Sequence, residues 1–410
     1  TPAPPLPPAP PPAPPITPAG PVYYFSDCQA GAAAGCVTGN NSNAGTGSAA
    51  PKRDLSGFNV NTLPAGAQLL FQRGGAWNWV NVRLENNNVT PAQPMVIDAY
   101  GSGERPLFRV NLGGASAIDF GNYNNTSNDG GYTLRNVKLD GLGSSATGLF
   151  LIHNLRHVTI ESTEITGFHI AIHAQSRAPH GVTNVLIRNN SISGNTAMGI
   201  LGQLSDSVIE GNQFHSNNYI SGSGFNHGTY LSGNADGGRN IVLRNNRYTR
   251  NSALNGVCLG GNMTFHGQLD GVLIEGNTIE QDAATAGCWL MSITQGYDTA
   301  EWFRNFVVRG NRLINGGNTA IAVQSAPGIV LEDNLIINTQ ASYQTGINAS
   351  HNEYQNGDVP DGNAVVRNNT ACYPTPANGS SVAHVTAPNS QVSNNVTLTG
   401  PDASSGVCAR

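Results

Sequence analysis

The sequence predicts an all-β solenoid in which short parallel strands stack coil upon coil. Three observations predict it: the composition, a repeated strand-and-turn unit, and a column of alternating charges. The chain has 410 residues, of which 39% are hydrophobic, 11% are charged and 50 are Gly. This composition excludes a disordered chain, a coiled coil and a helical bundle, and it favours repeated strands and turns.

The repeated unit begins near Gln68 and consists of an apolar strand that ends in a Gly/Asn–Asn turn. Its clearest copies are VLIRNNSI (185–192), SVIEGNQF (207–214), IVLRNNRY (241–248), VLIEGNTI (272–279), FVVRGNRL (306–313), IVLEDNLI (329–336) and AVVRNNTA (364–371). The second turn residue is Asn190, Asn212, Asn246, Asn277, Asn311, Asn334, Asn369 and Asn395. Its spacing of roughly 22 to 35 residues is that of a solenoid coil. Asn tolerates a left-handed backbone, and its side chain can form hydrogen bonds along a stack.

A second strand follows most copies and has a Gly/Ala-apolar pattern. The segments are HIAIHAQ (169–175), MGILGQL (198–204), HGTYLSG (227–233), NGVCLGG (255–261), TAIAVQS (319–325) and TGINAS (345–350). Alternation within such strands buries one side chain in two.

The third observation is a charge that changes sign at every coil, directly after the inward apolar residue of the first strand. The column is Arg135, Glu161, Arg188, Glu210, Arg244, Glu275, Arg309, Glu332 and Arg367. Adjacent parallel strands lie about 4.8 Å apart, so these charges form an exterior ladder in which each is flanked by two partners. We therefore interpret them as structural and exclude them from catalysis.

The chain divides into four expected parts. Residues 1–21 are a Pro/Ala-rich tether, residues 22–66 an N-terminal cap, residues 67–400 the solenoid and residues 401–410 a C-terminal tail. Pro-rich segments favour an extended spacer without a core.

Six cysteines fall into three local pairs, which predict three disulfides and an oxidising compartment. The pairs are Cys28 with Cys36, Cys258 with Cys288, and Cys372 with Cys408. No apolar run is long enough to span a bilayer, and no basic signal-peptide region stands at Thr1. We expect a mature exported protein that is secreted, periplasmic or attached to the cell surface, and monomeric. The net charge of −5 argues against nucleic acid as a partner.

These repeats resemble the right-handed parallel β-helix family. The segment GAQLLFQRGGAWNWVNVRLENNNVTPAQPMVIDAYGSGERPLF (66–108) also resembles the first coils of carbohydrate-active members of that family. The resemblance implies a right-handed parallel β-helix over roughly residues 67–400 and a polysaccharide as the partner. Similarity to the β-helix polysaccharide lyases implies cleavage of an acidic glycan by β-elimination. The sequence requires no cofactor and leaves calcium open.

The coils between Asn212 and Asn311 carry extensions, and insertions in a solenoid gather on one face. The extensions hold Asn234, Asp236, Arg239, Asn262, His266, Asp270, Gln295, Tyr297, Asp298 and Glu301. They are the predicted rim of a substrate groove.

β-Elimination needs a base, a proton donor for the leaving oxygen, and a cation or amide beside the uronate carboxylate. Tyr230 and His227 are the candidates for base and acid, with either order open, Arg239 or Arg177 could neutralise the carboxylate, and Asn226 or Asn234 could orient the substrate. The predicted substrate-binding residues are His173, Gln175, Arg177, Gln203, Asn226, Asn234, Asp236, His266, Gln295, Tyr297 and Asp298. His173 and Asn348 are expected in the column of Tyr230, and Gln175, Gln203, Ser232, Ser292, Gln324 and Ser350 in the next outward column. The competing interpretation is a stacked Gln/Ser ladder that only satisfies hydrogen bonds.

Two other functions stay open. A glycoside hydrolase would need two carboxylates roughly 5–10 Å apart, with candidates Asp206, Asp236, Asp270, Asp298 and Glu301. The Asp-Asp and Gly-His-Gly pattern of β-helix polygalacturonases and the Asp-Pro-His signature of alginate C5 epimerases are both missing. The other function is a glycan-binding or adhesive β-helix without catalysis. No metal site is predicted, because His153 with His157 and His169 with His173 are about 13 Å apart in strands.

Overall fold

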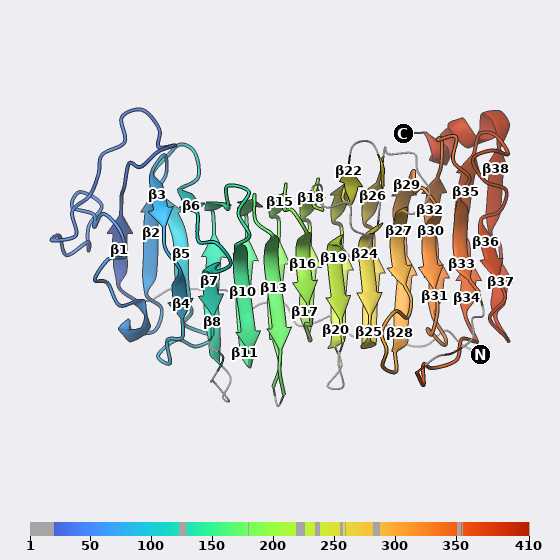
Figure 1. The fold of residues 1–410 in the computed structure, drawn as a ribbon, viewed down its shortest axis with the longest axis horizontal. Helices are drawn as coiled ribbons and strands as arrows, with labels where there is room; N and C mark the ends of the chain where they lie inside the picture. The colour runs from blue at the N-terminus through green and yellow to red at the C-terminus, as the bar shows by residue number, and fades with distance from the viewer. Residues whose placement is uncertain are drawn as a thin grey trace. The chain divides into compact units, whose positions relative to one another are not determined.

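The computed structural model describes residues 20–121, 123, 129–178, 180–218, 226–233, 238–254, 257–258, 260–281, 288–350, 354 and 356–409 (Figure 1). For residues 253, 254, 257, 258 and 288 only the backbone is described. These residues belong to two compact units, which divide between Asn195 and Thr196. Most of the predicted tether, residues 1–19, and two predicted rim residues, Asn234 and Asp236, lie outside the described residues.

The N-terminal unit, up to Asn195, consists of three parallel sheets, here called A, B and C. Sheet A contains β1 (Val22–Phe25), β2 (Gln68–Gln72), β5 (Met95–Tyr100), β8 (Asp129–Arg135), β11 (Leu155–Glu161) and β14 (Thr183–Arg188). Sheet B contains β3 (Ala76–Trp79), β6 (Leu107–Val110), β9 (Lys138–Asp140), β12 (Glu164–Thr166) and β15 (Ser191–Ser193). Sheet C contains β4 (Val82–Leu84), β7 (Ser116–Phe120), β10 (Thr147–His153) and β13 (Ile170–Ser176). A 3-10 turn, η1 (Val60–Thr62), precedes β2.

The C-terminal unit, from Thr196, repeats the three-sheet plan. Sheet A contains β17 (Ser207–Glu210), β20 (Gly238–Arg244), β25 (Gln268–Glu275), β28 (Trp302–Arg309), β31 (Val330–Glu332), β34 (Val365–Arg367) and β37 (Gln391–Ser393). Sheet B contains β18 (Gln213–His215), β21 (Arg247–Thr249), β26 (Thr278–Glu280), β29 (Arg312–Ile314), β32 (Leu335–Ile337), β35 (Thr370–Tyr373) and β38 (Val396–Thr399). Sheet C contains β16 (Met198–Gly202), β19 (His227–Ser232), β24 (Gly260–His266), β27 (Cys288–Ile293), β30 (Thr319–Val323), β33 (Thr345–Ala349) and β36 (Ala383–Val385).

A short antiparallel pair, β22 (Ala253–Leu254) with β23 (Val257–Cys258), extends from this unit, and η2 (Gly400–Ser404) and η3 (Gly406–Cys408) close the chain. The prediction of an all-β parallel solenoid is confirmed, because each coil contributes one strand to each sheet.

The turn between sheets A and B has the structure that its sequence predicts. Its first residue allows the chain to turn, and its second residue forms hydrogen bonds to the next coil. The first residue adopts the left-handed conformation, with φ of 64° at Gly211, 55° at Asn245 and 64° at Gly276, which Gly and Asn tolerate best. The second is a buried Asn whose side chain bonds to the next coil. Asn246 Oδ1 accepts from Asn212, Asn277 Oδ1 from Asn246, and the pattern continues through Asn311, Asn334, Asn369 and Asn395 at 2.9–3.1 Å. This Asn ladder satisfies backbone groups that the turn would otherwise bury without a partner.

The inward side chains of the strands form an apolar interior. On β20 and β25, for example, Ile241, Leu243 and Ile274 are completely buried. Aromatic rings also stack from coil to coil, as Phe214 does on Tyr248 with 4.5 Å between ring centroids. Burial of apolar area stabilises by roughly 25 cal/mol per Å² and provides the main driving force for stacking.

The alternating charges form ion pairs on sheet A, as predicted. Register places Arg309 between Glu275 and Glu332. The ion pairs join each Glu to the Arg of the following coil: Glu161–Arg188 and Glu332–Arg367 at 2.6 Å, and Glu210–Arg244 and Glu275–Arg309 at 2.7 Å. Arg135 contacts both neighbours, Asp98 at 2.6 Å and Glu161 at 3.5 Å.

Two of the predicted disulfides are present. Cys28 bonds to Cys36 beside β1, and Cys372 of β35 bonds to Cys408 of η3. The second bond anchors the tail on an apolar cluster that includes Ile314, Ile337 and Ala403. The Cys258–Cys288 pair lies outside the described side chains and stays a prediction.

Candidate active site

A cluster of four ring side chains on sheet C of the C-terminal unit is the strongest candidate for chemistry. His227 and Tyr230 lie on β19, His266 ends β24, and Tyr297 follows β27. Ring centroids are 5.3 Å apart for His227 and Tyr230, 5.4 Å for Tyr230 and His266, and 5.3 Å for His266 and Tyr297. We call these residues the His–Tyr cluster. Two of them, His266 and Tyr297, are predicted only as substrate-binding residues by the sequence.

His227 is held as a neutral imidazole. Its Nδ1 accepts the Gly261 N–H at 3.1 Å and lies 3.2 Å from Thr264 Oγ1. Burial, together with the nearby His266, lowers the pKa of His227 to about 3. Because Nδ1 accepts a hydrogen bond, the single proton lies on Nε2. His227 is therefore a fixed donor near Tyr230 and a poor base at neutral pH.

Tyr230 is paired with Tyr297, and their hydroxyl oxygens are 2.5 Å apart. Burial raises the pKa of Tyr230 above its ordinary value, and the hydrogen bond to Tyr297 acts in the same direction. The Tyr230 phenol thus keeps its proton at neutral pH. Because its pKa is raised, Tyr230 is a weak acid, and it can donate its proton only to an oxygen that becomes strongly basic, as a leaving alkoxide does.

His266 is backed by a carboxylate. Its Nδ1 lies 3.4 Å from Glu301 Oε1, and Glu301 is completely buried. The Glu301 carboxylate also accepts the backbone N–H groups of Gly267, Gly296 and Tyr297. Burial acts to raise the pKa of Glu301, but the nearby His266 and the hydrogen bonds from the backbone outweigh it and hold the pKa below its ordinary value. The ionised Glu301 is thus an ion-pair partner for His266 Nδ1, which makes no hydrogen bond within the described part of the chain, and a carboxylate beside an imidazole is a common arrangement for proton transfer.

A distant segment holds this carboxylate in place. The Glu301 N–H donates to Asp358 Oδ1 at 2.8 Å, and the Val359 N–H donates to the Glu301 carbonyl at 3.1 Å. Asn356 Nδ2 donates to the Tyr297 carbonyl at 3.2 Å. Sequence reasoning missed Asp358 because no repeat position marks it, and it treated Glu301 as a rim carboxylate although the structure buries it.

The other predicted residues of this unit lie around the cluster in different ways. Arg239 is exposed on β20 of sheet A, in register with Asp270. Among the described residues, no hydrogen bond, ion pair or ring contact joins Arg239 to the His–Tyr cluster. Gln203 is buried, and Asp298 is exposed. The Asn226 carbonyl accepts from Asn218 and Ser252.

The predicted columns are partly corrected by the register. Tyr230 lies beside Thr264, and Thr264 lies beside Ser292, so Ser292 belongs to the Tyr230 column. The same column continues to Asn348, as predicted. The neighbour of Ser232 is His266. The extended coil therefore places an imidazole where the simple repeat predicts a further hydroxyl.

Three predicted residues belong to the N-terminal unit. His173 stacks on Phe150 with 4.7 Å between centroids, and burial lowers its pKa. Gln175 is in register with Ile152, and both Gln175 and Arg177 are exposed. Their roles stay predictions.

The described part of the chain contains no group of three or more His, Cys, Asp or Glu side chains arranged to hold a metal ion. Among its helices, none is long and apolar enough to cross a membrane.

The chain has the fold of the right-handed parallel β-helix proteins. Residues 122–292 match the family model described as a right handed beta helix region. No curated protein matches the sequence.

Solved structures similar to the chain have different activities. A GH136 lacto-N-biosidase from Eubacterium ramulus is 12% identical, with a TM-score of 0.52, covering 92% of this chain and 68% of that one. Pectate lyase Pel9A is 13% identical, with a TM-score of 0.51 and coverage of 91% and 80%. PfbA, a surface adhesin of Streptococcus pneumoniae, is 14% identical, with a TM-score of 0.53 and coverage of 80% and 84%. The shared feature is the fold, so function has to be argued from the site.

Proposed function

We propose that this protein is an exported polysaccharide lyase that cleaves an acidic glycan by β-elimination at the His–Tyr cluster. The observation that carries the proposal is the His266–Glu301 pair beside the Tyr230–Tyr297 pair. One pair supplies a base and the other a proton donor, from side chains whose rings are 5.4 Å apart. The formed disulfides and the carbohydrate-active relatives support an extracellular protein that acts on glycans.

The reaction would divide between the two pairs. His266 takes the proton from the carbon next to the uronate carboxylate, and that electron pair forms the new double bond. The bond from the sugar to the leaving oxygen breaks, and Tyr230 donates its proton to that oxygen. Solvent then reprotonates Tyr230 through Tyr297 and removes the proton from His266, so no water is consumed.

The uronate carboxylate would accept hydrogen bonds from side-chain amide N–H groups. Gln295 precedes Tyr297 by two residues, and its Oε1 accepts from Ser325 Oγ at 3.2 Å, which leaves the amide N–H groups for a ligand. Such donors can stabilise charge that develops on the carboxylate. Asn348 lies in the Tyr230 column but four strands away, about 19 Å at about 4.8 Å per strand, so it is too distant to bind the same carboxylate. The proposal leaves Arg239 out because it lies on sheet A without a contact to the cluster.

The structure gives a hydrolase weaker support. Glu301 already receives three backbone N–H groups, so it is not available to activate water or protonate a leaving group. Asp270 accepts from Asn305 at 2.6 Å, and Asp298 is exposed beside the cluster. Asp206, another candidate, accepts from Asn240 at 2.8 Å, whereas glycoside hydrolysis would need two carboxylates on either side of the bond.

The deciding experiment incubates the protein with polygalacturonate, alginate and neutral polysaccharides and follows two products. A lyase creates an unsaturated uronate that absorbs in the ultraviolet. A hydrolase releases reducing ends without this absorbance. Inversion at the uronate carbon, read by proton NMR, would instead indicate an epimerase, and glycan binding without any product would indicate an adhesive protein.

His266→Gln and Tyr230→Phe test the site. Each is expected to lower the lyase rate at least about 100-fold, since general acid–base catalysis contributes roughly 10²- to 10⁴-fold. The matched controls are His384→Gln and Tyr343→Phe, because both residues are exposed in the same unit. Full lyase activity in either site variant would overturn this assignment.

A further inference from the structure

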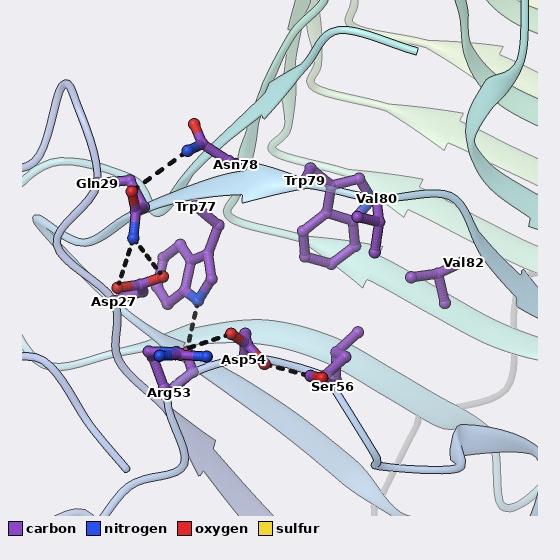
Figure 2. A pocket seen from close by; sticks show the side chains of 11 residues that line it. Asp27, Gln29, Arg53, Asp54, Ser56, Trp77, Asn78, Trp79, Val80 and Val82 are labelled. Carbon is purple, nitrogen blue, oxygen red and sulfur yellow. Dashed lines mark hydrogen bonds and ion pairs between the residues drawn. The ribbon is translucent and has the colours of Figure 1, made fainter. Parts of the chain in front are cut away.

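A pocket in the N-terminal unit lies apart from the His–Tyr cluster in sequence and chemistry. It has a volume of about 440 Å³ and forms where the segment after β1 meets β3 and β4 (Figure 2). Its walls include Trp77, Trp79, Asp27, Gln29, Asn78 and Arg53. This size and this mixture of apolar surface with a few polar groups are typical of small-molecule sites. We propose that it binds one neutral sugar residue of a glycan.

The aromatic wall is rigid. Trp77 Nε1 donates to the Arg53 carbonyl at 2.9 Å, and Trp79 Nε1 donates to the Ala117 carbonyl at 3.1 Å. Trp79 also stacks on Phe108 with 4.0 Å between centroids. Both indole N–H groups are occupied within the protein, and Trp77 and Trp79 are only 2% and 6% exposed, so they form the rigid floor of the pocket. Accessible apolar surface comes from Val80, which is 63% exposed, and apolar surface suits the C–H groups of a pyranose.

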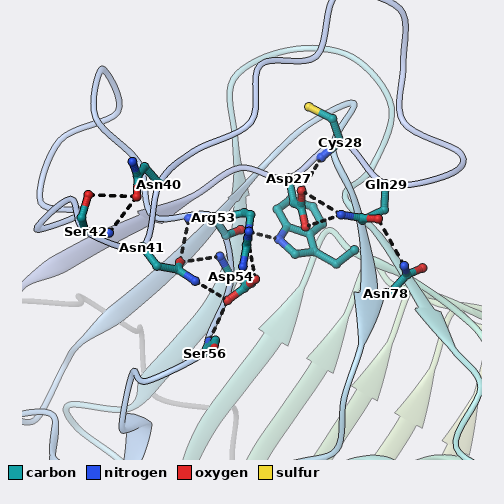
Figure 3. A network of polar contacts seen from close by, with 11 residues as sticks. Asp27, Cys28, Gln29, Asn40, Asn41, Ser42, Arg53, Asp54, Ser56 and Asn78 are labelled. Carbon is teal, nitrogen blue, oxygen red and sulfur yellow. Dashed lines mark hydrogen bonds and ion pairs between the residues drawn. The ribbon is translucent and has the colours of Figure 1, made fainter.

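The polar wall is a connected row of planar groups (Figure 3). The carboxylate of Asp27 is buried, with 5% exposure, and accepts from the Cys28 N–H at 2.8 Å and from Gln29 Nε2 at 3.3 Å. Gln29 Oε1 in turn accepts from Asn78 Nδ2 at 3.2 Å. The row holds donors and acceptors side by side, which matches sugar hydroxyls because each hydroxyl both donates and accepts.

The charge of the pocket selects against an acidic sugar. Arg53 pairs with Asp54 at 2.9 Å, so the guanidinium is already balanced. The Asp27 carboxylate then leaves the pocket with one net negative charge. A uronate placed there would be repelled, and burial of Asp27 strengthens this repulsion. The ligand therefore differs from the acidic substrate proposed for the His–Tyr cluster.

The segment that carries the polar wall is tied down. The Cys28–Cys36 disulfide follows Asp27 directly, and the Gln29 N–H donates to the Ala76 carbonyl at 3.0 Å. The pocket is thus preformed, which lowers the entropic cost of binding. This gives the predicted cap a binding role in addition to its structural one.

The test is saturation-transfer NMR of the full chain with methyl glycosides of glucose, galactose and mannose. The acidic probe is the methyl glycoside of galacturonic acid, with its carboxylate free. Trp fluorescence gives the affinity, since two of the four Trp residues line the pocket. We expect saturation transfer to at least one neutral glycoside, and any transfer to the uronate should be the same in wild type and Val80→Arg, because the uronate would bind at the His–Tyr cluster and not in this pocket.

Val80→Arg should weaken that binding at least about 10-fold, because Val80 lines the pocket with 63% exposure and can change without disturbing the core. Val37→Arg is the matched control: this Val is 70% exposed and does not line the pocket. The melting temperature of both variants should equal that of the wild type.

Three results would overturn the proposal: no saturation transfer to any neutral glycoside, binding of the neutral glycoside that Val80→Arg leaves unchanged, or uronate binding that Val80→Arg weakens to the same extent. The readout is the effect of Val80→Arg on binding, so it is independent of whether the lyase proposal fails.

Discussion

Two polar regions of the C-terminal unit differ in where the ion-pair and hydrogen-bond partners of their side chains come from. On sheet A, Glu210, Glu275 and Glu332 each pair with the Arg of the following coil at 2.6–2.7 Å. On sheet C, the His–Tyr cluster and Glu301 follow no repeat, and their partners come from loops and from Asp358. A polar residue that recurs at the same position in every coil forms its ion pair with the residue at that position in the next coil. Polar residues that interrupt the period are buried by specific contacts, and those are the candidates for function.

The largest expected difference between the regions is in activity. Glu301→Gln keeps the shape of the side chain but removes the charge that orients His266. We expect the lyase rate to fall about 100-fold or more. Glu332→Gln, the same change on the charge ladder, should leave the rate unchanged, as measured by ultraviolet absorbance on the active polysaccharide. Equal rates in the two variants would mean that the buried carboxylate has no catalytic role.

The next difference concerns pH. His227 has a folded pKa of about 3 against 6.5 for an ordinary histidine. Above pH 6.5 both folded and unfolded forms are neutral, and the full stability is present. As pH falls from 6.5 towards 3, only the unfolded state binds the proton, so stability is lost. Between pH 7 and 4.5 this amounts to about 2.5 kcal/mol.

Urea denaturation of wild type and His227→Gln at both pH values measures this term. Other titrating groups contribute to both proteins and cancel in the comparison. The wild type should lose about 2.5 kcal/mol more than His227→Gln on acidification. An identical loss in both would show that His227 titrates normally in the folded state.

A third comparison sets the interior Asn ladder against the surface charges. Asn277 Nδ2 donates to the Leu243 carbonyl at 2.9 Å, and its Oδ1 accepts from the Asn246 N–H at 3.0 Å. Asn277→Ala leaves that buried N–H without a partner and should lower the free energy of unfolding by about 2–3 kcal/mol. Denaturation in urea at neutral pH gives the value, and a loss below about 0.5 kcal/mol would contradict it.

The smallest expected effect is on the charge ladder itself. Arg309 is half-buried and pairs with Glu275 at 2.7 Å. Arg309→Ala should lower the free energy of unfolding by about 1 kcal/mol or less, and the difference should shrink in high salt. A larger loss that salt does not change would show that the ladder is a buried ionic network.

The repeat could be predicted in detail because each copy has the same environment. The strand VLIEGNTI (272–279) has the same inward residues, turn and outward charge as its neighbours, so its pairing follows from alignment alone. The Cys28–Cys36 and Cys372–Cys408 disulfides were predictable for a related reason, since both partners lie close in sequence or in the stack.

The candidate site could be predicted only in part. The extended coils pointed to His227, Tyr230, His266 and Tyr297, and ring contacts join all four. Their chemical roles could not be predicted, because the burial that lowers the pKa of His227 and the position of Glu301 beside His266 both depend on the tertiary structure. Asp358 contacts Glu301 across 57 residues, and no local pattern in the sequence marks that contact.

The sequence by itself therefore determined the parallel β-helix, its coil register, the Asn turns and the charge ladder, because stacking makes each position depend mainly on its equivalent in the next coil. Only the tertiary structure decided which irregular residues meet. It buried Glu301 behind His266, joined Tyr230 to Tyr297, and formed a pocket from Asp27, Trp77 and Trp79. Those contacts depend on the conformations of individual loops. Because each of these loops occurs only once in the chain, the sequence contains no repeat from which its contacts could be predicted.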